Sequence, residues 1–223
     1  MDGTGLLFKP LLGALPDSIT ATVVAYPTDR PLGYAELLPL AMAALPKDSE
    51  FAILAESFSG PLALMLAATN PAGLRGVVLC GTFVRSPLPR PLSWLAGWAR
   101  PWWFGLKPRA LARWLLLGRY CNDELRELFE SALAQVKPSV LAARARAVVA
   151  ANADDALRTC RVPILYLAAN ADRVVRPGSL QLIQRLCPQV AAITLSGPHL
   201  LLQAAPVDAA REIAAFVKRV SAR

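Results

Sequence analysis

The sequence has few of the residues that bind metals in proteins. It contains one histidine among 223 residues, and its four cysteines are widely separated, with no CxxC pair: Cys80, Cys121, Cys160 and Cys187. A zinc site needs three or four such ligands close together. We therefore expect no metal site, and we interpret the cysteines as buried, reduced thiols of a cytoplasmic protein.

The chain also lacks a segment that is apolar for long enough to span a membrane. Its longest uncharged stretches, such as residues 57–74, are interrupted by glycine, proline and asparagine, whereas a span needs about 20 apolar residues. Residues 1–5 have neither the basic region nor the apolar run of a signal peptide. Scattered arginines account for the formal net charge of +8, and no nucleic-acid-binding motif accompanies them. We expect a cytoplasmic protein that binds no nucleic acid.

Short apolar segments alternate with segments of helical periodicity. Five segments are β-branched or apolar throughout, which is typical of buried strands: 20–26, 50–55, 74–83, 162–169 and 190–195. Helical patterns occupy 33–45, 58–68 and 207–220. Apolar strands separated by helices predict an α/β protein with a mostly parallel sheet that is covered on both faces.

Residues 84–160 interrupt this alternation with a long, helical and proline-punctuated stretch that has no strand signal. We predict one core domain in two parts, 1–83 and 161–223, into which 84–160 is inserted as a helical cap.

The segment AESFSG, residues 55–60, places Ser57 between a predicted strand and a predicted helix. A nucleophile elbow has this arrangement, in which small neighbours such as Ser59 and Gly60 let strand and helix approach at a strained turn. The turn puts the serine hydroxyl at a helix amino end, which favours developing negative charge. Ser59 is a weaker candidate, because Pro61 stands where a small residue is needed. For this stretch alone, a loop serine without a catalytic role is the alternative.

The candidate acid and base lie further along the chain. His199, the single histidine, follows the last predicted strand, and Asp172 follows the strand before it. Serine, aspartate and histidine thus each come just after a strand, at the edge where open α/β sheets carry their sites. A lone histidine in an apolar stretch is usually a core residue, but three independent placements agree here. We therefore predict a triad of Ser57, His199 and Asp172.

Four motifs, in their order and spacing, resemble those of the α/β-hydrolase-fold superfamily, in particular serine esterases and lipases with a helical cap: DGTGLLF, AESFSGPLAL, PILYLAANADRVV and GPHLLLQAAP. The resemblance covers nearly the whole chain. It implies that Ser57 attacks an acyl carbonyl, that His199 moves the proton and that Asp172 orients the imidazole. It also implies that the Phe58 backbone N–H is one oxyanion donor.

In such proteins the second oxyanion donor comes from a loop that resembles Pro-Gly, an apolar residue and DGTG. Here DGTG is residues 2–5, so we expect Met1, Asp2 and Gly3 to line the oxyanion site. Turn chemistry explains Asp2 better than a catalytic carboxylate does. The central strand that should precede the loop is missing, and each backbone group left unpaired would cost roughly 1–3 kcal/mol. We therefore expect Met1 to lie inside a longer reading frame or to mark a truncation.

The insertion combines tryptophan with positive charge. All five tryptophans fall within residues 94–114, and residues 85–119 include no acidic residue. One interpretation is a cap that, with Phe83, lines a pocket for a small hydrophobic acyl ester. The other is contact with a membrane surface or a lipid. An anionic carrier of the acyl group, such as an acidic protein or coenzyme A, would also suit the charge.

The leading prediction is a serine hydrolase of carboxylic esters that uses no metal or organic cofactor. A thioesterase, an acyltransferase, a lysophospholipase or a perhydrolase could use the same triad. A catalytically silent binding protein is the alternative outside enzymes. The sequence does not predict the oligomeric state.

Overall fold

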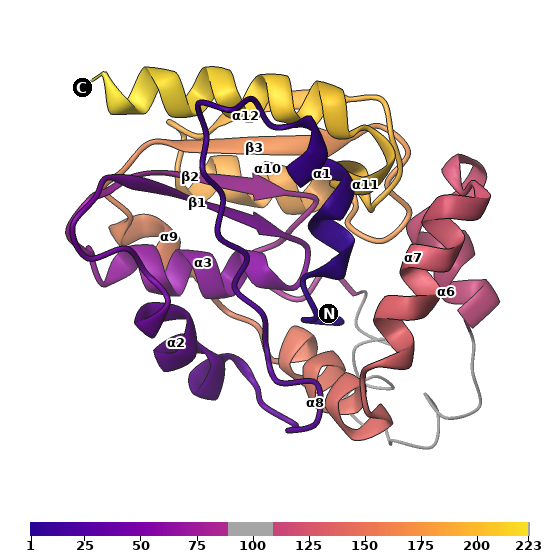
Figure 1. Ribbon diagram of the computed structural model, residues 1–223. Coiled ribbons are helices and arrows are strands. Elements are labelled where there is room, and N and C mark those ends of the chain that lie inside the picture. Colours follow the sequence, from indigo (N-terminus) through magenta and orange to yellow (C-terminus); the bar gives the residue numbers. More distant parts are fainter. Residues whose placement is uncertain (89–108, 223) are drawn as a thin grey trace.

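Four parallel strands form the centre of the molecule. The computed structural model describes residues 1–88 and 109–222 (Figure 1). Its strands lie side by side in chain order: β1 (Phe51–Glu56), β2 (Leu74–Cys80), β3 (Ile164–Ala169) and β4 (Ala191–Leu195). Because all neighbouring pairs are parallel, every strand ends at the same edge of the sheet.

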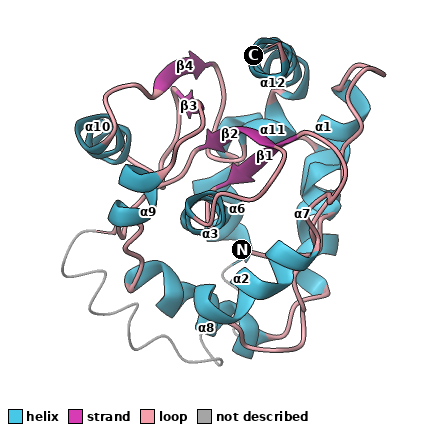
Figure 2. Ribbon diagram, turned by 90° about the vertical axis from the view of Figure 1, so that its left-hand side faces the viewer, coloured by secondary structure: helices cyan, strands magenta, loops and turns pink. Residues whose placement is uncertain are grey.

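Helices cover both faces of this sheet (Figure 2). One layer consists of α3 (Ser59–Ala68), α9 (Asp154–Thr159) and α10 (Pro177–Leu186), and the other of α1 (Lys9–Ala14), α11 (Leu201–Ala204) and α12 (Pro206–Ser221). Successive strand residues point to opposite faces. Within β2, Val77 and Leu79 therefore pack in the first layer's core, while Val78 and Cys80 pack in the second. This confirms the predicted parallel sheet with two covered faces.

The remaining helices lie at the start of the chain and between β2 and β3. The short 3-10 helix η1 (Leu6–Phe8) precedes α1, and α2 (Tyr34–Ala43) packs on α3. Between β2 and β3 the described elements are helical: α6 (Arg109–Leu116), η2 (Gly118–Tyr120), α7 (Asp123–Ala134), α8 (Pro138–Val149) and α9. In Figure 1, α6 and α7 stand beyond the carboxyl ends of β1 and β2. Helix α9 instead packs on α3, so the inserted stretch returns to the core before residue 160. Its role as a cap stays a prediction.

Four of the five predicted strands are confirmed, and α2, α3 and α12 confirm the predicted helices. The prediction of a buried strand at 20–26 is wrong, because the segment belongs to no strand and Thr20, Thr22 and Ala25 are exposed. A strand is stabilised by a hydrogen-bonded neighbour. The backbone hydrogen bond described for this segment joins the Tyr26 N–H to the Gly3 carbonyl at 2.7 Å, which is no ladder. A β-branched composition alone cannot supply the missing neighbour.

Part of the tryptophan-rich segment lies outside the described residues, namely Trp94, Trp98, Trp102 and Trp103. Trp114 belongs to α6, and Phe83 is buried in a cluster with Phe58 and Leu37. Among the described helices, none is both long and apolar enough to cross a membrane.

Gly60 allows α3 to begin directly against the loop that follows β2. A Cβ atom at this position would lie 1.9 Å from Thr82 Oγ1 and 2.7 Å from Thr82 Cβ. We predict that Gly60→Ala lowers the free energy of unfolding by about 1–3 kcal/mol, because the helix must move away from the loop. Urea unfolding followed by circular dichroism measures this change.

Gly13→Ala in α1 is the matched control. Nothing lies within 4 Å of a Cβ atom at position 13, and alanine favours a helix interior over glycine by about 1 kcal/mol. We expect this variant to be as stable as the wild type or slightly more stable. Equal losses in the two variants would contradict the packing argument.

Candidate active site

Ser57 occupies a sharp turn between β1 and α3. Its φ of 53° lies in the left-handed region, which residues other than glycine seldom adopt. The Ser57 N–H donates to the Cys80 carbonyl at 2.9 Å, and the Ser57 carbonyl accepts from the Gly60 N–H at 3.1 Å and from the Thr82 hydroxyl. These bonds stabilise a conformation that costs about 1–3 kcal/mol. The turn has the geometry of the predicted nucleophile elbow.

His199 and Asp172 reach this turn from the loops that follow β4 and β3. His199 Nε2 lies 2.7 Å from the Ser57 Oγ, and His199 Nδ1 lies 2.8 Å from Asp172 Oδ2. The other carboxylate oxygen, Oδ1, accepts the N–H groups of Val174 and Val175 at 2.7 and 2.8 Å. The structure thus brings the predicted serine, histidine and aspartate into direct contact, with the carboxylate fixed by its own loop.

The imidazole and the carboxylate are shielded from water. The side chains of His199 and Asp172 are 2% and 6% exposed. Gly81 lies against both residues, and its φ of 49° is a left-handed conformation that favours glycine. Hydrogen bonds are stronger in such a poorly hydrated site. The arrangement can move a proton from the serine hydroxyl to the ring while the carboxylate stabilises the cationic ring.

The cysteines offer no competing nucleophile at this site. All four are free thiols, and Cys80, at the end of β2, is fully buried. Burial raises the pKa of the Cys80 thiol well above its usual value, so the reactive thiolate is disfavoured. In residues 1–88 and 109–222, no group of three acidic, histidine or cysteine side chains could hold a metal ion.

Phe58 directly precedes α3 and is held in place by two tyrosines. Its ring stacks on that of Tyr34 at 4.8 Å between centroids, and the Tyr34 hydroxyl donates to the Phe58 carbonyl at 2.9 Å. The Tyr26 ring meets the Phe58 ring edge-on at 6.4 Å. Phe58 is the N-cap residue of α3, so its N–H lies at the amino end of the helix, where donors have no partner in the helix.

Residues 1–3 are linked to the elbow through Tyr26. The Tyr26 N–H donates to the Gly3 carbonyl, and its hydroxyl donates to Ser59 Oγ at 3.1 Å. Asp2 Oδ2 accepts the Thr4 N–H and the Thr4 hydroxyl at 3.0 and 2.7 Å. The Asp2 carboxylate therefore forms a local turn, as its Asp-Gly context predicts.

Arg144 in α8 is a buried residue beside this loop that the sequence analysis missed. Its guanidinium donates to the carbonyls of Met1 and Asp2 at 2.6 and 2.7 Å and to the Pro27 carbonyl at 2.9 Å. The local signal is weak. In the stretch AARARAVVA, Arg146 has similar neighbours in sequence and is nevertheless exposed.

Glu56, directly before Ser57, is a second buried group that the sequence analysis missed. Its carboxyl accepts the Gln203 side-chain amide at 2.9 Å and the Leu202 N–H at 3.3 Å. Burial raises the pKa of Glu56 because its surroundings disfavour the charged form more strongly than these donors favour it. The contact joins the elbow strand β1 to α11, directly after His199.

A cavity of about 260 Å³ adjoins the loops that carry Asp172 and His199. Ala171 and Pro198, the chain neighbours of Asp172 and His199, contribute to its wall, and the charged part of the lining is Arg119 and Arg173. Within the described residues, neither arginine forms an ion pair with a carboxylate. The cavity is therefore cationic.

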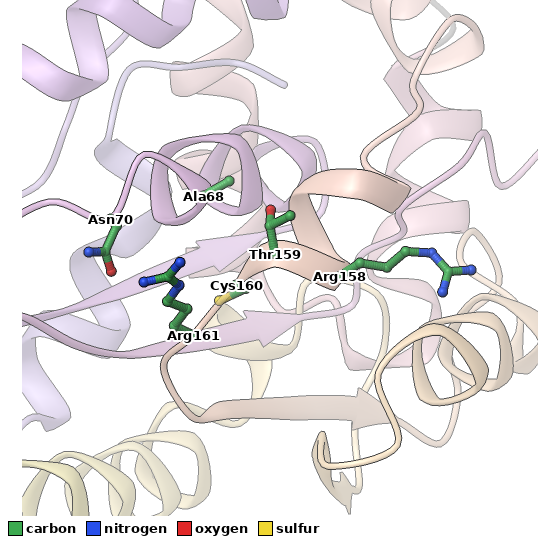
Figure 3. Close-up of a pocket in the computed structure, with 6 residues that line it drawn as sticks. All are labelled: Ala68, Asn70, Arg158, Thr159, Cys160 and Arg161. Atoms are coloured by element: carbon green, nitrogen blue, oxygen red, sulfur yellow. The ribbon is translucent and has the colours of Figure 1, made fainter.

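A larger cavity, of about 440 Å³, lies at the opposite edge of the sheet. Figure 3 shows Arg161, just after α9, near Asn70 at the end of α3, whereas the side chain of Arg158 in α9 points away from them. These segments precede β3 and β2, so the cavity is at the amino edge of the sheet. Sites in parallel sheets form at the carboxyl edge, and Ser57 lies there.

Comparisons with known proteins agree with the fold. A family model described as Serine aminopeptidase, S33, matches residues 36–195. A solved hydrolase from Oleispira antarctica has a TM-score of 0.84 at 12% sequence identity, and the match covers 98% of this chain and 88% of that chain. A thermophilic esterase from Thermogutta terrifontis has a TM-score of 0.73 at 17% identity, with 97% and 86% covered. An enol-lactonase from Burkholderia xenovorans has a TM-score of 0.75 at 16% identity, with 98% and 88% covered.

No curated protein matches the sequence. Structural likeness at these identities concerns the fold alone, and it confirms the fold that the motifs predicted.

The raised pKa of Glu56 predicts a pH-dependent effect of its substitution. The folded protein holds the Glu56 proton more tightly than the unfolded chain does, and this tighter binding stabilises the fold. The stabilisation is fully present below the pKa of Glu56 in the unfolded chain, and it is lost as the pH rises through the pKa in the folded protein. Glutamine stays neutral at every pH. We predict that the Tm of Glu56→Gln rises relative to the wild-type Tm as the pH increases above about 4. Thermal unfolding across this range measures the difference.

Glu127→Gln is the control, because Glu127 is exposed on α7. Its Tm should follow that of the wild type at every pH. A Glu56→Gln difference that does not vary with pH would show that Glu56 has no raised pKa in the folded protein.

Proposed function

Because the chain belongs to the serine aminopeptidase, S33, family of α/β-hydrolases, we propose that it is a serine hydrolase that cleaves carboxylic esters. Ser57 is the nucleophile, His199 the general base and acid, and Asp172 the residue that orients His199. One observation carries the proposal: hydrogen bonds run from Asp172 Oδ2 through both ring nitrogens of His199 to the hydroxyl of Ser57. For a histidine that only fills the core, there is no reason for its ring nitrogen to bond to a serine in a strained backbone conformation.

The proposed reaction has two halves. In the first, the Ser57 Oγ bonds to the ester carbonyl carbon while His199 Nε2 takes the hydroxyl proton. His199 then gives this proton to the departing alcohol oxygen as the C–O bond breaks, and the acyl group remains on Ser57. In the second half, water attacks the acyl carbon and gives a proton to Nε2, which passes it to the leaving Ser57 oxygen. The carboxylic acid is released and the serine hydroxyl is restored.

Charge on the carbonyl oxygen must be stabilised in both halves. We assign the Phe58 N–H as one donor, because it lies at the amino end of α3 next to Ser57. The second donor would come from residues 1–3, which Tyr26 links to the elbow through its bonds to Gly3 and Ser59. Removal of one such donor typically lowers kcat by about 10²–10³-fold.

The cationic cavity favours a second candidate, an ester or thioester whose acyl or leaving group carries negative charge. Gly118, with a φ of 53°, allows the Arg173 guanidinium to approach the backbone, since a Cβ atom there would lie 2.8 Å from Arg173 Nη1. The same guanidinium lies over the Trp114 ring at 4.5 Å and donates to the Trp114 carbonyl at 3.0 Å. Arg173 is thus held beside Asp172 with its charge unpaired among the described residues. An acyl group on an acidic carrier would suit this placement.

Replacement of Ser57 tests the leading proposal. We predict that Ser57→Ala lowers kcat for 4-nitrophenyl esters by at least about 10⁴-fold, because the hydroxyl forms the acyl-enzyme. Hydrolysis of esters from acetate to laurate, beside an amino acid 4-nitroanilide, measures both the activity and the preference for esters over amides. A fluorophosphonate probe followed by mass spectrometry should modify Ser57.

Ser131→Ala on the exposed side of α7 is the matched control and should keep full activity. Hydrolysis that persists in Ser57→Ala would exclude Ser57 as the nucleophile. A folded wild type that neither hydrolyses these compounds nor reacts with the probe would favour a catalytically silent binding protein.

Replacement of both cavity arginines tests the second candidate. We predict that Arg119→Met with Arg173→Met lowers kcat/KM for mono-4-nitrophenyl glutarate about threefold to tenfold, the range expected for solvent-screened charge pairs. 4-Nitrophenyl valerate is a neutral ester with an acyl chain of the same length, and its kcat/KM should stay within about twofold. The difference should shrink at high salt. Arg185→Met, on the exposed side of α10, is the control and should leave both kcat/KM values unchanged. An equal fall in kcat/KM for the two esters in the double variant, or a similar fall for the glutarate ester in Arg185→Met, would contradict an anion preference.

A further inference from the structure

The Arg144 side chain is a buried cation that bonds to backbone rather than to a carboxylate. It is fully buried, and each hydrogen bond described for its guanidinium goes to a carbonyl: Met1 and Asp2 from Nη1, and Pro27 from Nη2. Its Nε has no partner, and the guanidinium lies 5.7 Å from the centre of the Tyr26 ring. Burial of a charge is unfavourable unless the surroundings compensate for its lost hydration. What this arrangement fixes is the path of the backbone at residues 1–3 and 27.

Helix α8 gives Arg144 a firm base for this contact. At the amino end of the helix, the Lys137 N–H donates to the Thr28 carbonyl at 2.9 Å. Val140, Ala142 and Val148 on the same helix are buried. The helix is therefore docked on residues 27–28, and the arginine reaches past them to the start of the chain.

The carbonyls that Arg144 holds determine the direction of the neighbouring N–H groups. No peptide bond among the described residues is cis, and in a trans peptide the N–H points away from the carbonyl. By holding the Met1 and Asp2 carbonyls, the guanidinium orients the peptide planes Met1–Asp2 and Asp2–Gly3. Gly3 lets the guanidinium approach the backbone of this loop, because a Cβ atom at position 3 would lie 2.7 Å from Arg144 Nη1.

We propose that Arg144 is a positioning residue for the oxyanion site. It holds residues 1–3 at the elbow so that a backbone N–H of this loop faces the carbonyl oxygen of the substrate. Arg144 itself touches neither the substrate nor the reacting atoms. The proposal rests on the proposed ester hydrolysis by Ser57, and it makes the helical insertion a part of the catalytic geometry.

Arg144→Met tests the proposal, because methionine keeps an unbranched apolar stem and removes all donors. We expect kcat for a 4-nitrophenyl ester to fall about 10²-fold or more, as for loss of an oxyanion donor, with KM changed by less than about threefold. A trifluoromethyl ketone forms a tetrahedral adduct with a reactive serine, and its inhibition constant should rise by the same factor as kcat falls. Arg144→Lys keeps the charge but not the planar guanidinium, so its kcat should lie between those of the wild type and Arg144→Met. Arg185→Met should match the wild type.

Gly3→Ala is a second test, which keeps Arg144 in place in case the Arg144 variants do not fold. Its Cβ atom would lie 2.7 Å from Arg144 Nη1 and 2.9 Å from Tyr26 Cβ, and the φ of 74° at this position disfavours alanine. The loop must therefore shift, and we expect the same parallel change in kcat and inhibition constant. A purely structural role would lower the Tm and the active fraction, and it would leave kcat per labelled Ser57 and the inhibition constant unchanged. That result in either folded variant would overturn the proposal. Lack of hydrolysis and of Ser57 labelling in the wild type would instead overturn the proposed function.

Discussion

The left-handed backbone of Ser57 is the constraint on which the rest of the site depends. Ser57, with a φ of 53°, forms together with Phe58 the short turn between β1 and α3, and its hydroxyl lies at the carboxyl edge of the sheet. A serine does not adopt that conformation without compensation. The Cys80 carbonyl accepts a hydrogen bond from the Ser57 N–H, and the Thr82 hydroxyl donates one to the Ser57 carbonyl. Both partners belong to the end of β2 and the residues after it, so the turn requires the neighbouring strand. Gly60 is required for the same reason, since Thr82 occupies the space of its missing side chain.

The parallel sheet then brings Asp172 and His199 to this point. β3 and β4 end at the same edge as β1, and their following loops are joined to each other as well as to Ser57. The Ala171 N–H donates to the Gly197 carbonyl, and the Gly197 N–H donates to the Asn170 side chain at 3.0 and 3.1 Å. Asp172 and His199 therefore approach Ser57 as one unit rather than as two independent loops. Their contact of 2.8 Å follows from backbone bonds that flank both residues.

These features explain which parts of the site could be predicted from sequence. The strands at 50–55 and 162–169 have local apolar patterns, and Ser57, Asp172 and His199 each follow a strand, so their common edge could be inferred from topology. The segment 20–26 has an equally good strand pattern, but a strand also requires a neighbour, and composition does not show whether one is present. Arg144 and Glu56 could not be found for a related reason. Their partners lie more than a hundred residues away in sequence, and nothing in their local sequence distinguishes them from exposed charges such as Arg146.

The two buried ionisable side chains, Glu56 and Arg144, connect the elbow to parts of the chain that no sheet bond reaches. Glu56 joins β1 to α11, directly after His199, and Arg144 joins α8 to residues 1–3. The insertion makes a further contact on the histidine side, where the Leu200 N–H donates to the Leu116 carbonyl of α6 at 3.0 Å. Helices between β2 and β3 therefore contact both residues 1–3 and the residue that follows His199. Buried ionic groups contribute little net stability on average, and their better-supported role is to specify one arrangement among several. On this view, changes in α6 or α8 would alter how residues 1–3 and His199 are aligned with Ser57.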